Sequence, residues 1–230
     1  MKTFRRRDDA IVERMDDPQC DEAMLFRTYR QFAQINPLLA RWSAVYARLI
    51  RPVLQPGVPA TLLDVGFGGG DIPHALDRWA RRDGFELRIT AIDPDPRANR
   101  FAATWPHNER IEFRMADTAT LLAEGALFDV VISNAVLHHL NPDTLAGFFA
   151  DTRALARRLV VHNDTVRSAA AYLLYSVFVA PWLRHSFAAE DGRLTVRRSY
   201  RPDELRALAP GWRIERLAPF RQLVCWQAPP

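Results

Sequence analysis

Lysine is nearly absent from this sequence: Lys2 is the only one, and arginine supplies the rest of the positive charge. The formal net charge of +4 and the sequence pI of about 9.5 are values that polyanion-binding proteins also have. The basic residues are nevertheless spread along all 230 positions and form no separate module. We interpret them as a solvated surface and expect no nucleic-acid partner, with a polyanion-binding face as the alternative.

Cysteine is also scarce, because the chain has only Cys20 and Cys225. The two lie far apart and show no metal-ligand spacing, which argues against a disulfide scaffold, a zinc site and a redox pair. We therefore expect no metal and a reducing, cytoplasmic environment.

Long apolar runs are missing too. The charged N-terminal residues contain no apolar core of a secretory signal. The longest apolar stretch, residues 169–183, is shorter than the ~20 residues that a bilayer span needs, and Pro181 interrupts it. A buried helix is the expectation there, not stable insertion into a membrane.

What the chain does have is the stretch LLDVGFGGGD, residues 62–71. An apolar run that meets Asp64 and then breaks into glycines predicts a buried strand that turns into a helix, with a ligand against the turn. The dinucleotide fingerprint G-x-G-x-x-G fails here, because its third glycine, counted from Gly66, is Asp71. A carboxylate at that point would meet phosphate, so the loop favours a cationic ligand with an amino group and a sulfonium.

The rest of the chain alternates strands with helices, which predicts an α/β fold with a parallel, doubly wound sheet. Asp93, at the end of the second strand, is expected to bind ribose hydroxyls, unless it caps the following helix. The expected strands cover residues 61–65, 86–92, 110–115, 128–134 and 158–162, with a closing hairpin at 212–217 and 220–227.

The flanks are expected to differ from this core. Residues 1–56 are predicted to form a polar, solvated tail, including Arg5, Arg6 and Arg7, and a helical cap of two helices separated near Asn36 and Pro37. Residues 57–230 are then the cofactor domain. An insertion at about 165–200 holds a hydrophobic helix at 166–183, followed by an irregular segment at 185–200.

From residue 61 to residue 164 the chain resembles the class I S-adenosylmethionine (SAM) dependent methyltransferases. It is most similar to the small-molecule branch, which includes ubiquinone and menaquinone C-methyltransferases and natural-product O-methyltransferases. LLDVGFGGGD matches the cofactor loop apart from Phe67, AIDPDP the ribose-binding acid, MADTATL the adenine-side acid, and FDVVISNAVLHHL the strand and loop between cofactor and substrate. The resemblance implies SAM as cofactor and a seven-stranded sheet whose last two strands are antiparallel. It implies these cofactor-binding residues: Asp64, Gly66, Phe67, Gly68, Asp71, Asp93, Pro94, Asp117, Thr118 and Asn134.

Candidate catalytic residues follow the fourth and fifth strands. His138 is expected to be the base or a substrate ligand and His139 to be structural, although both could simply pack or cap at a helix start. His162 and Asn163 are expected to contact substrate. Asp164 could orient a histidine or cap the next helix. Asp117, likewise, could cap the helix at 118–124 instead of binding adenine.

Aromatic residues suggest an apolar acceptor. Tyr172, Tyr175, Phe178 and Trp182 lie in the hydrophobic helix, which could cover the substrate, pack in the core or touch a bilayer surface. Tyr29 could close over the ligand or pack in the core.

The expected activity is O-methylation of a small aromatic or lipophilic molecule by a monomer or homodimer. The alternatives are an RNA or protein methyltransferase and a non-catalytic SAM-binding protein. The stretch at 133–136, SNAV, lacks the N-P-P-aromatic signature of amino-group methyltransferases.

Overall fold

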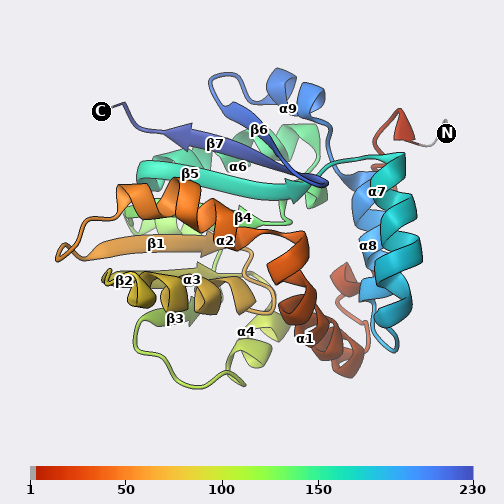
Figure 1. The fold of residues 1–230 in the computed structure, drawn as a ribbon, viewed down its shortest axis with the longest axis horizontal. Helices are drawn as coiled ribbons and strands as arrows, with labels where there is room; N and C mark the ends of the chain where they lie inside the picture. The colour runs from red at the N-terminus through yellow and green to blue at the C-terminus, as the bar shows by residue number, and fades with distance from the viewer. Residues whose placement is uncertain (1–3, 230) are drawn as a thin grey trace.

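The protein folds around one seven-stranded sheet, as a computed structural model that describes residues 4–229 shows (Figure 1). The strand order is β3-β2-β1-β4-β5-β7-β6, in which β7 runs antiparallel to β5 and β6 and the other neighbours are parallel. The predicted doubly wound, mainly parallel sheet with a closing hairpin is therefore confirmed. The strands are β1 (Ala60–Val65), β2 (Leu87–Ile92), β3 (Ile111–Arg114), β4 (Phe128–Asn134), β5 (Ala156–Thr165), β6 (Arg213–Leu217) and β7 (Arg221–Gln227).

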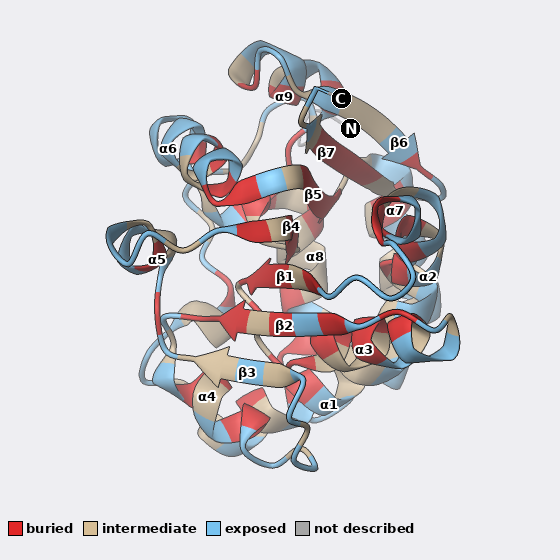
Figure 2. Cartoon of the chain, turned by 90° about the vertical axis from the view of Figure 1, so that its left-hand side faces the viewer, coloured by how far each residue is buried: buried red, intermediate tan, exposed pale blue. Residues whose placement is uncertain are grey.

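Helices cover both faces of the sheet. Figure 2 shows α5 and α6 on one side and α2 and α3 on the other. Trp42 and Leu62 belong to the apolar cluster under α2 and α3, whereas Leu63 and Val160 belong to the cluster on the opposite face. The helices are α1 (Glu22–Leu39), α2 (Trp42–Val45), α3 (Asp71–Arg82), α4 (Pro96–Ala102), α5 (Thr118–Ala123), α6 (Pro142–Ala154), α7 (Ala169–Leu174), α8 (Ala188–Arg198) and α9 (Pro202–Leu208).

Side-chain caps fix where several helices begin. In each case the side-chain oxygen of the residue before the helix accepts a hydrogen bond from a backbone N–H of the first turn, which satisfies a donor that the helix leaves free. These caps are Asp21 for α1, Asp95 for α4, Asp117 for α5, Asn141 for α6 and Ser168 for α7.

Two predictions about the flanks are wrong. The break expected near Asn36 and Pro37 lies further on, because α1 continues through Pro37 and ends before Arg41, which adopts a left-handed conformation with φ of 53°. The segment 185–200 is not irregular but contains α8. Gly192 in α8 has no Cβ, and a Cβ there would lie 2.2 Å from the ring of Tyr175. Glycine disfavours a helix in general, but at this position it allows α8 and the segment that carries Tyr175 to pack closely.

The carboxyl ends of the parallel strands are covered by helices. α1, α7 and α8 gather at this edge, at the right in Figure 1, and α8 packs against both α1 and α7.

None of the helices within residues 4–229 has the length and apolar character that a membrane span requires. The division of the chain at residue 56 stays a prediction.

Candidate functional site

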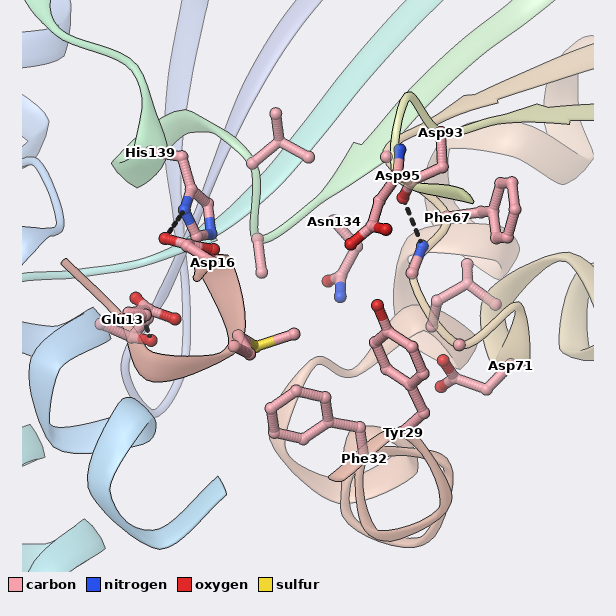
Figure 3. A pocket seen from close by; sticks show the side chains of 18 of the residues that line it. Glu13, Asp16, Tyr29, Phe32, Phe67, Asp71, Asp93, Asp95, Asn134 and His139 are labelled. Atoms are coloured by element: carbon pink, nitrogen blue, oxygen red, sulfur yellow. Dashed lines mark hydrogen bonds and ion pairs between the residues drawn. The ribbon is translucent and has the colours of Figure 1, made fainter. Parts of the chain in front are cut away.

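A cavity of about 520 Å³ opens at the carboxyl ends of β1, β2 and β4. Figure 3 shows that α1 closes one side of it and that the hydroxyl of Tyr29 points into it. Of the residues predicted to bind cofactor, the cavity is lined by Asp64, Gly66, Phe67, Gly68, Asp71, Asp93, Pro94 and Asn134. The structure thus brings most of the predicted cofactor residues together.

The glycine loop after β1 needs glycine for steric reasons. Gly66 has φ of +77°, and a Cβ there would lie 2.7 Å from Cγ2 of Val136. The backbone N–H of Gly68 donates a 2.9 Å hydrogen bond to Oδ2 of Asp93. A Cβ on Gly69 would lie 2.9 Å from Cβ of Tyr29. The hydrogen bond to Asp93 and the close contact with Tyr29 of α1 therefore fix the shape of the loop.

Three carboxylates, the buried Asp64 and Asp93 and the partly buried Asp71, give this cavity its electrostatic character. Burial raises the pKa of Asp64 well above its ordinary value, and Asp71 and Asp93 add to the effect. Oδ1 of Asp64 has no hydrogen-bond partner among the described residues. Burial also raises the pKa of Asp71, whose Oδ2 accepts a 2.9 Å hydrogen bond from Asn36. A cationic amino group would satisfy the free oxygen and offset the cost of burying these groups, so the site fits SAM.

Asn134 connects the cavity to two distant elements. Its Oδ1 accepts hydrogen bonds from Nε1 of Trp42 at 2.9 Å and from Nη2 of Arg221 at 2.7 Å. The next residue, Ala135, has φ of 58°, a conformation that costs a non-glycine residue energy. The chain after β4 is thus held in a strained turn against the cavity.

Asp117 and Thr118, which were predicted to bind the cofactor, do not line the cavity. Asp117 caps α5, and its Oδ1 accepts hydrogen bonds from the N–H and the hydroxyl of Thr120 at 2.8 and 2.7 Å. Thr118 donates its hydroxyl to Asp151 at 2.8 Å. The capping alternative describes this Asp117 side chain.

His138 is held between two carboxylates and is not a free base. Its Nδ1 lies 2.8 Å from Oδ1 of Asp164, and its Nε2 lies 3.3 Å from Oε1 of Glu13. Burial lowers the pKa of His138, but the two carboxylates outweigh burial and raise the pKa to about 9. With a carboxylate against each ring nitrogen, neither nitrogen is open to take a proton from a substrate, and this arrangement favours a structural role for His138. Asp164 contacts His138 from a position outside the cavity, and a catalytic role for it stays a prediction.

His139 lines the cavity and lies against His138, with ring centroids 4.2 Å apart. Its Nδ1 lies 3.1 Å from Oδ2 of Asp16, which also pairs with Arg198 at 3.0 Å. Burial raises the pKa of Asp16, but these partners lower it to about 2. His139 therefore helps to hold residue 16 at the cavity wall.

The predicted substrate residues His162 and Asn163 lie inside the sheet, not in the cavity. Ser133 and Thr152 flank the His162 ring, with hydroxyls 2.8 Å from Nδ1 and 3.2 Å from Nε2. Burial lowers the pKa of His162 to about 3. Asn163 donates to the carbonyl of Ala40 at 2.7 Å. Because β5 extends to residue 165, these side chains belong to the core and to the anchor of α1.

The N-terminal segment, residues 4–20, supplies cavity residues that the sequence did not reveal. Glu13, Met15 and Asp16 line the cavity. Arg97 of α4 donates to the carbonyl of Met15 at 3.1 Å and to that of Asp17 at 2.7 Å. These partners lie about 80 residues apart in the chain, so no local pattern signals the contact.

Arg7 shows that the predicted solvated tail is wrong at this position. Its guanidinium donates to the backbone carbonyls of His138, Leu140 and Arg198 at 2.7, 2.8 and 2.6 Å. It also lies 4.2 Å from the ring centre of Tyr200. The N-terminal segment therefore packs along the chain that follows β4.

One group of side chains has the composition of a metal site. Glu13, His138 and His139 place three potential ligand atoms within 4.8 Å of one another. Each already has a partner, and the guanidinium of Arg198 lies 3.9 Å from Oε1 of Glu13. The opposite charges of these side chains balance one another without a metal ion. That the reaction needs no metal stays a prediction.

A second cavity, of about 430 Å³, adjoins the first. Tyr175 lines it and donates its hydroxyl to the carbonyl of Ala188 at 2.6 Å. Tyr172 does not line it but packs its ring 5.4 Å from that of Phe4. Phe178 lines the cavity although 66% exposed, and Trp182 is 84% exposed and lies outside it. Only part of the predicted aromatic lid therefore faces a cavity.

Known proteins resemble the chain in sequence. A family model described as a methyltransferase domain matches residues 62–158. An uncharacterized methyltransferase of Mycobacterium tuberculosis is 33% identical over 211 residues, which cover 82% of this chain and 98% of the relative. A ubiquinone biosynthesis O-methyltransferase of Methylocella silvestris is 33% identical over 158 residues, which cover 64% of this chain and 56% of the relative.

Solved structures share the fold. Human N-acetylserotonin methyltransferase in complex with SAM has a TM-score of 0.65 at 13% identity, covering 90% of this chain and 56% of that one. Magnesium protoporphyrin IX methyltransferase from Synechocystis with bound S-adenosylhomocysteine (SAH) has a TM-score of 0.54 at 15% identity, covering 86% and 84%. Fold, glycine loop and sequence relatives agree: the chain belongs to the class I SAM-dependent methyltransferases, and SAM is its cofactor.

Proposed function

We propose that the protein transfers the methyl group of SAM to an oxygen of a small, apolar acceptor held in the second cavity. The observation that supports this most directly is that the two cavities adjoin each other. They share the lining residues Phe32, Asn36, Asn134, Ala135 and Thr195. An acceptor in the second cavity would therefore lie beside a cofactor in the first.

On the cofactor side, SAM supplies an electrophilic methyl group on a good leaving group. Asp93 would take the ribose hydroxyls, and Asp64 would accept from the amino group through its unpaired oxygen. The glycine loop leaves room for the ligand to lie against the backbone. These residues bind and orient the cofactor and need no proton transfer of their own.

On the acceptor side, the second cavity has the size and lining of a small-molecule site. Leu39, Leu174, Phe178 and Val179 give it an apolar wall. Such a wall binds an apolar body and excludes water, whereas a nucleic acid or a protein surface would need a wider, more polar groove. This favours a small molecule over the RNA and protein alternatives.

Catalysis would then rest mainly on position. Holding donor and acceptor at near-attack distance can supply ~7–11 kcal/mol of the barrier. Neither ring nitrogen of His138 is free, because Asp164 and Glu13 lie against them.

The names of the ubiquinone O-methyltransferase and N-acetylserotonin methyltransferase also support small acceptors.

The test is methyl transfer from radiolabelled SAM to a panel of apolar phenols and carboxylic acids, with bulk tRNA and a protein pool as separate arms. We expect label in the small molecules, and the same rate with EDTA present. Label only in tRNA or protein would overturn the proposal. Tight SAH binding without any labelled product, in the panel or in an extract of the source organism, would favour the non-catalytic alternative.

A matched pair of variants locates the acceptor. Ala171 in α7 lines the second cavity, so Ala171→Phe should fill it. Leu173 in the same helix is 61% exposed, so Leu173→Phe is the control. We expect Ala171→Phe to lower kcat/KM at least about tenfold with unchanged SAH affinity, and the control to have no effect. Equal activity in both variants would place the acceptor elsewhere.

A further inference from the structure

Among the described residues that line the second cavity, only Arg221 carries a charge. The apolar side chains of this cavity, such as Leu174 and Val179, cannot balance it. A cation at the wall of an apolar cavity is costly unless an anion meets it. The charge of Arg221 therefore requires an anionic partner.

The described part of the chain supplies no such anion directly. The guanidinium donates to Oδ1 of Asn163 at 2.8 Å, to its carbonyl at 2.9 Å, to Thr165 at 3.0 Å and to Asn134 at 2.7 Å. All four acceptors are uncharged. A guanidinium has five N–H donors, so one N–H, on Nη1, has no partner among residues 4–229.

Among residues 4–229, the carboxylate that acts on Arg221 through space is that of Asp164. Its oxygens are bonded to His138 and to the N–H of Thr165. Burial lowers the pKa of Arg221 to about 10, and the charge of Asp164 offsets this lowering only in part. Arg97 is the opposite case, because its bonds to Asp95 raise its pKa. Arg221 is thus a partly buried cation that forms no hydrogen bond to a carboxylate among the described residues.

The position of Arg221 links this charge to the reaction. Asn134, which accepts from Arg221, lines both cavities, and so does Ala135. Arg221 therefore lies where the second cavity adjoins the cofactor cavity. An acceptor with an apolar body and an acidic oxygen would match both the apolar lining and this charge.

Resting on the function proposed above, we propose that Arg221 binds an acidic oxygen of the acceptor, from a phenol or a carboxylic acid, and holds it as an anion beside the cofactor cavity. The oxygen gives up its proton to solvent. Its lone pair then forms the O–CH3 bond while the C–S bond breaks, and that electron pair stays on sulfur, leaving neutral SAH. The cation stabilises the oxyanion, so the reaction needs no protein base, which agrees with the engaged state of His138.

The test compares two probes of the same shape, 1-naphthoate and 1-naphthamide, by calorimetry with the SAH-bound protein. One charge-assisted hydrogen bond corresponds to roughly a tenfold gain in affinity, so we expect naphthoate to bind about tenfold tighter than naphthamide. In Arg221→Gln this preference should vanish while naphthamide affinity stays the same. In Arg221→Lys part of the preference should return.

The outcomes separate this inference from the proposed function. Equal affinity of the wild-type protein for both probes overturns the role of Arg221 but leaves the acceptor cavity intact. Binding of SAH but of neither probe removes the acceptor cavity itself. SAH affinity reports whether Arg221→Gln is folded. If the variant is not folded, the preference of the wild-type protein for naphthoate over naphthamide still tests the role of Arg221. A titration of 1-naphthol across its ionisation tests the same preference for a phenol.

Discussion

Glu13 places a carboxylate oxygen 3.3 Å from Nε2 of His138, although one belongs to the N-terminal segment and the other to the loop after β4. Both side chains are buried. Thr195 of α8 also donates to Oε1 of Glu13 at 2.8 Å. The pair therefore ties the N-terminal segment to two elements of the cavity wall, which gives His138 a structural role.

The first prediction concerns His138→Gln. Removing the cation takes from two buried carboxylates, Asp164 and Glu13, the charge that lies against both of them, so we expect a loss of ~3 kcal/mol in the free energy of unfolding. Methyl transfer should persist. His139→Gln is the control, because its partner Asp16 is only partly buried and a loss of ~0–1 kcal/mol is expected. Urea unfolding and initial rates measure both. A large fall in kcat at unchanged stability would restore His138 as the base.

The second prediction is a pH dependence of stability. The pKa of His138 rises from its ordinary value of 6.5 to about 9 on folding. Folding therefore takes up a proton, and this contribution is fully present below the unfolded pKa and is lost as pH rises through about 9. We expect the difference in unfolding free energy between wild type and His138→Gln to narrow between about pH 6 and pH 10. A constant difference would mean that His138 is not ion-paired.

The fold was predictable because its signals are local. Alternating strands and helices, and an acid at each strand end, require only short windows of sequence, and Asp93 accordingly lies at the cavity. Asp117 shows the limit of this reasoning. The same D-x-x-T pattern that places an acid after a strand also makes a helix cap, and in the structure the cap is formed.

Side-chain placement was less predictable where distant segments decide it. His162 was expected as the last residue of a strand, but β7 pairs with β5 as far as Thr165 and extends it, with His162 opposite Val224. Arg7 and Glu13 bind groups far along the chain, so only the folded structure reveals them. The acceptor site depends on the same long-range packing.

The third prediction isolates the contact in the glycine loop. Gly66 and Gly125 both have positive φ, +77° and +68°, so alanine at either position costs about 1–2 kcal/mol of backbone strain. Only at Gly66 would the new Cβ also meet an atom, Cγ2 of Val136 at 2.7 Å. We therefore expect Gly66→Ala to destabilise the protein more than Gly125→Ala and to weaken SAH binding. Equal effects on stability and on SAH affinity, read by thermal unfolding and calorimetry, would contradict this.

The fourth prediction compares two acids that sequence alone treats alike. Asp93 lies at the cavity and holds the N–H of Gly68 and that of Asp95, each at 2.9 Å. Asp93→Asn keeps the size of the side chain but loses its charge and one acceptor oxygen. We expect SAH affinity to fall at least about tenfold, or ~1.4 kcal/mol.

Asp117→Asn is the matched control. Asparagine caps helices about as well as aspartate, so both α5 and the SAH affinity should stay unchanged within about twofold. Calorimetric titration of both variants with SAH measures the difference. If Asp117→Asn weakened binding as much as Asp93→Asn, the start of α5 would have to open toward the cofactor, and the adenine role that the family resemblance implies for Asp117 would stand. Retained affinity in Asp117→Asn would leave Asp93, and not Asp117, as the acid that binds the nucleoside part of SAM.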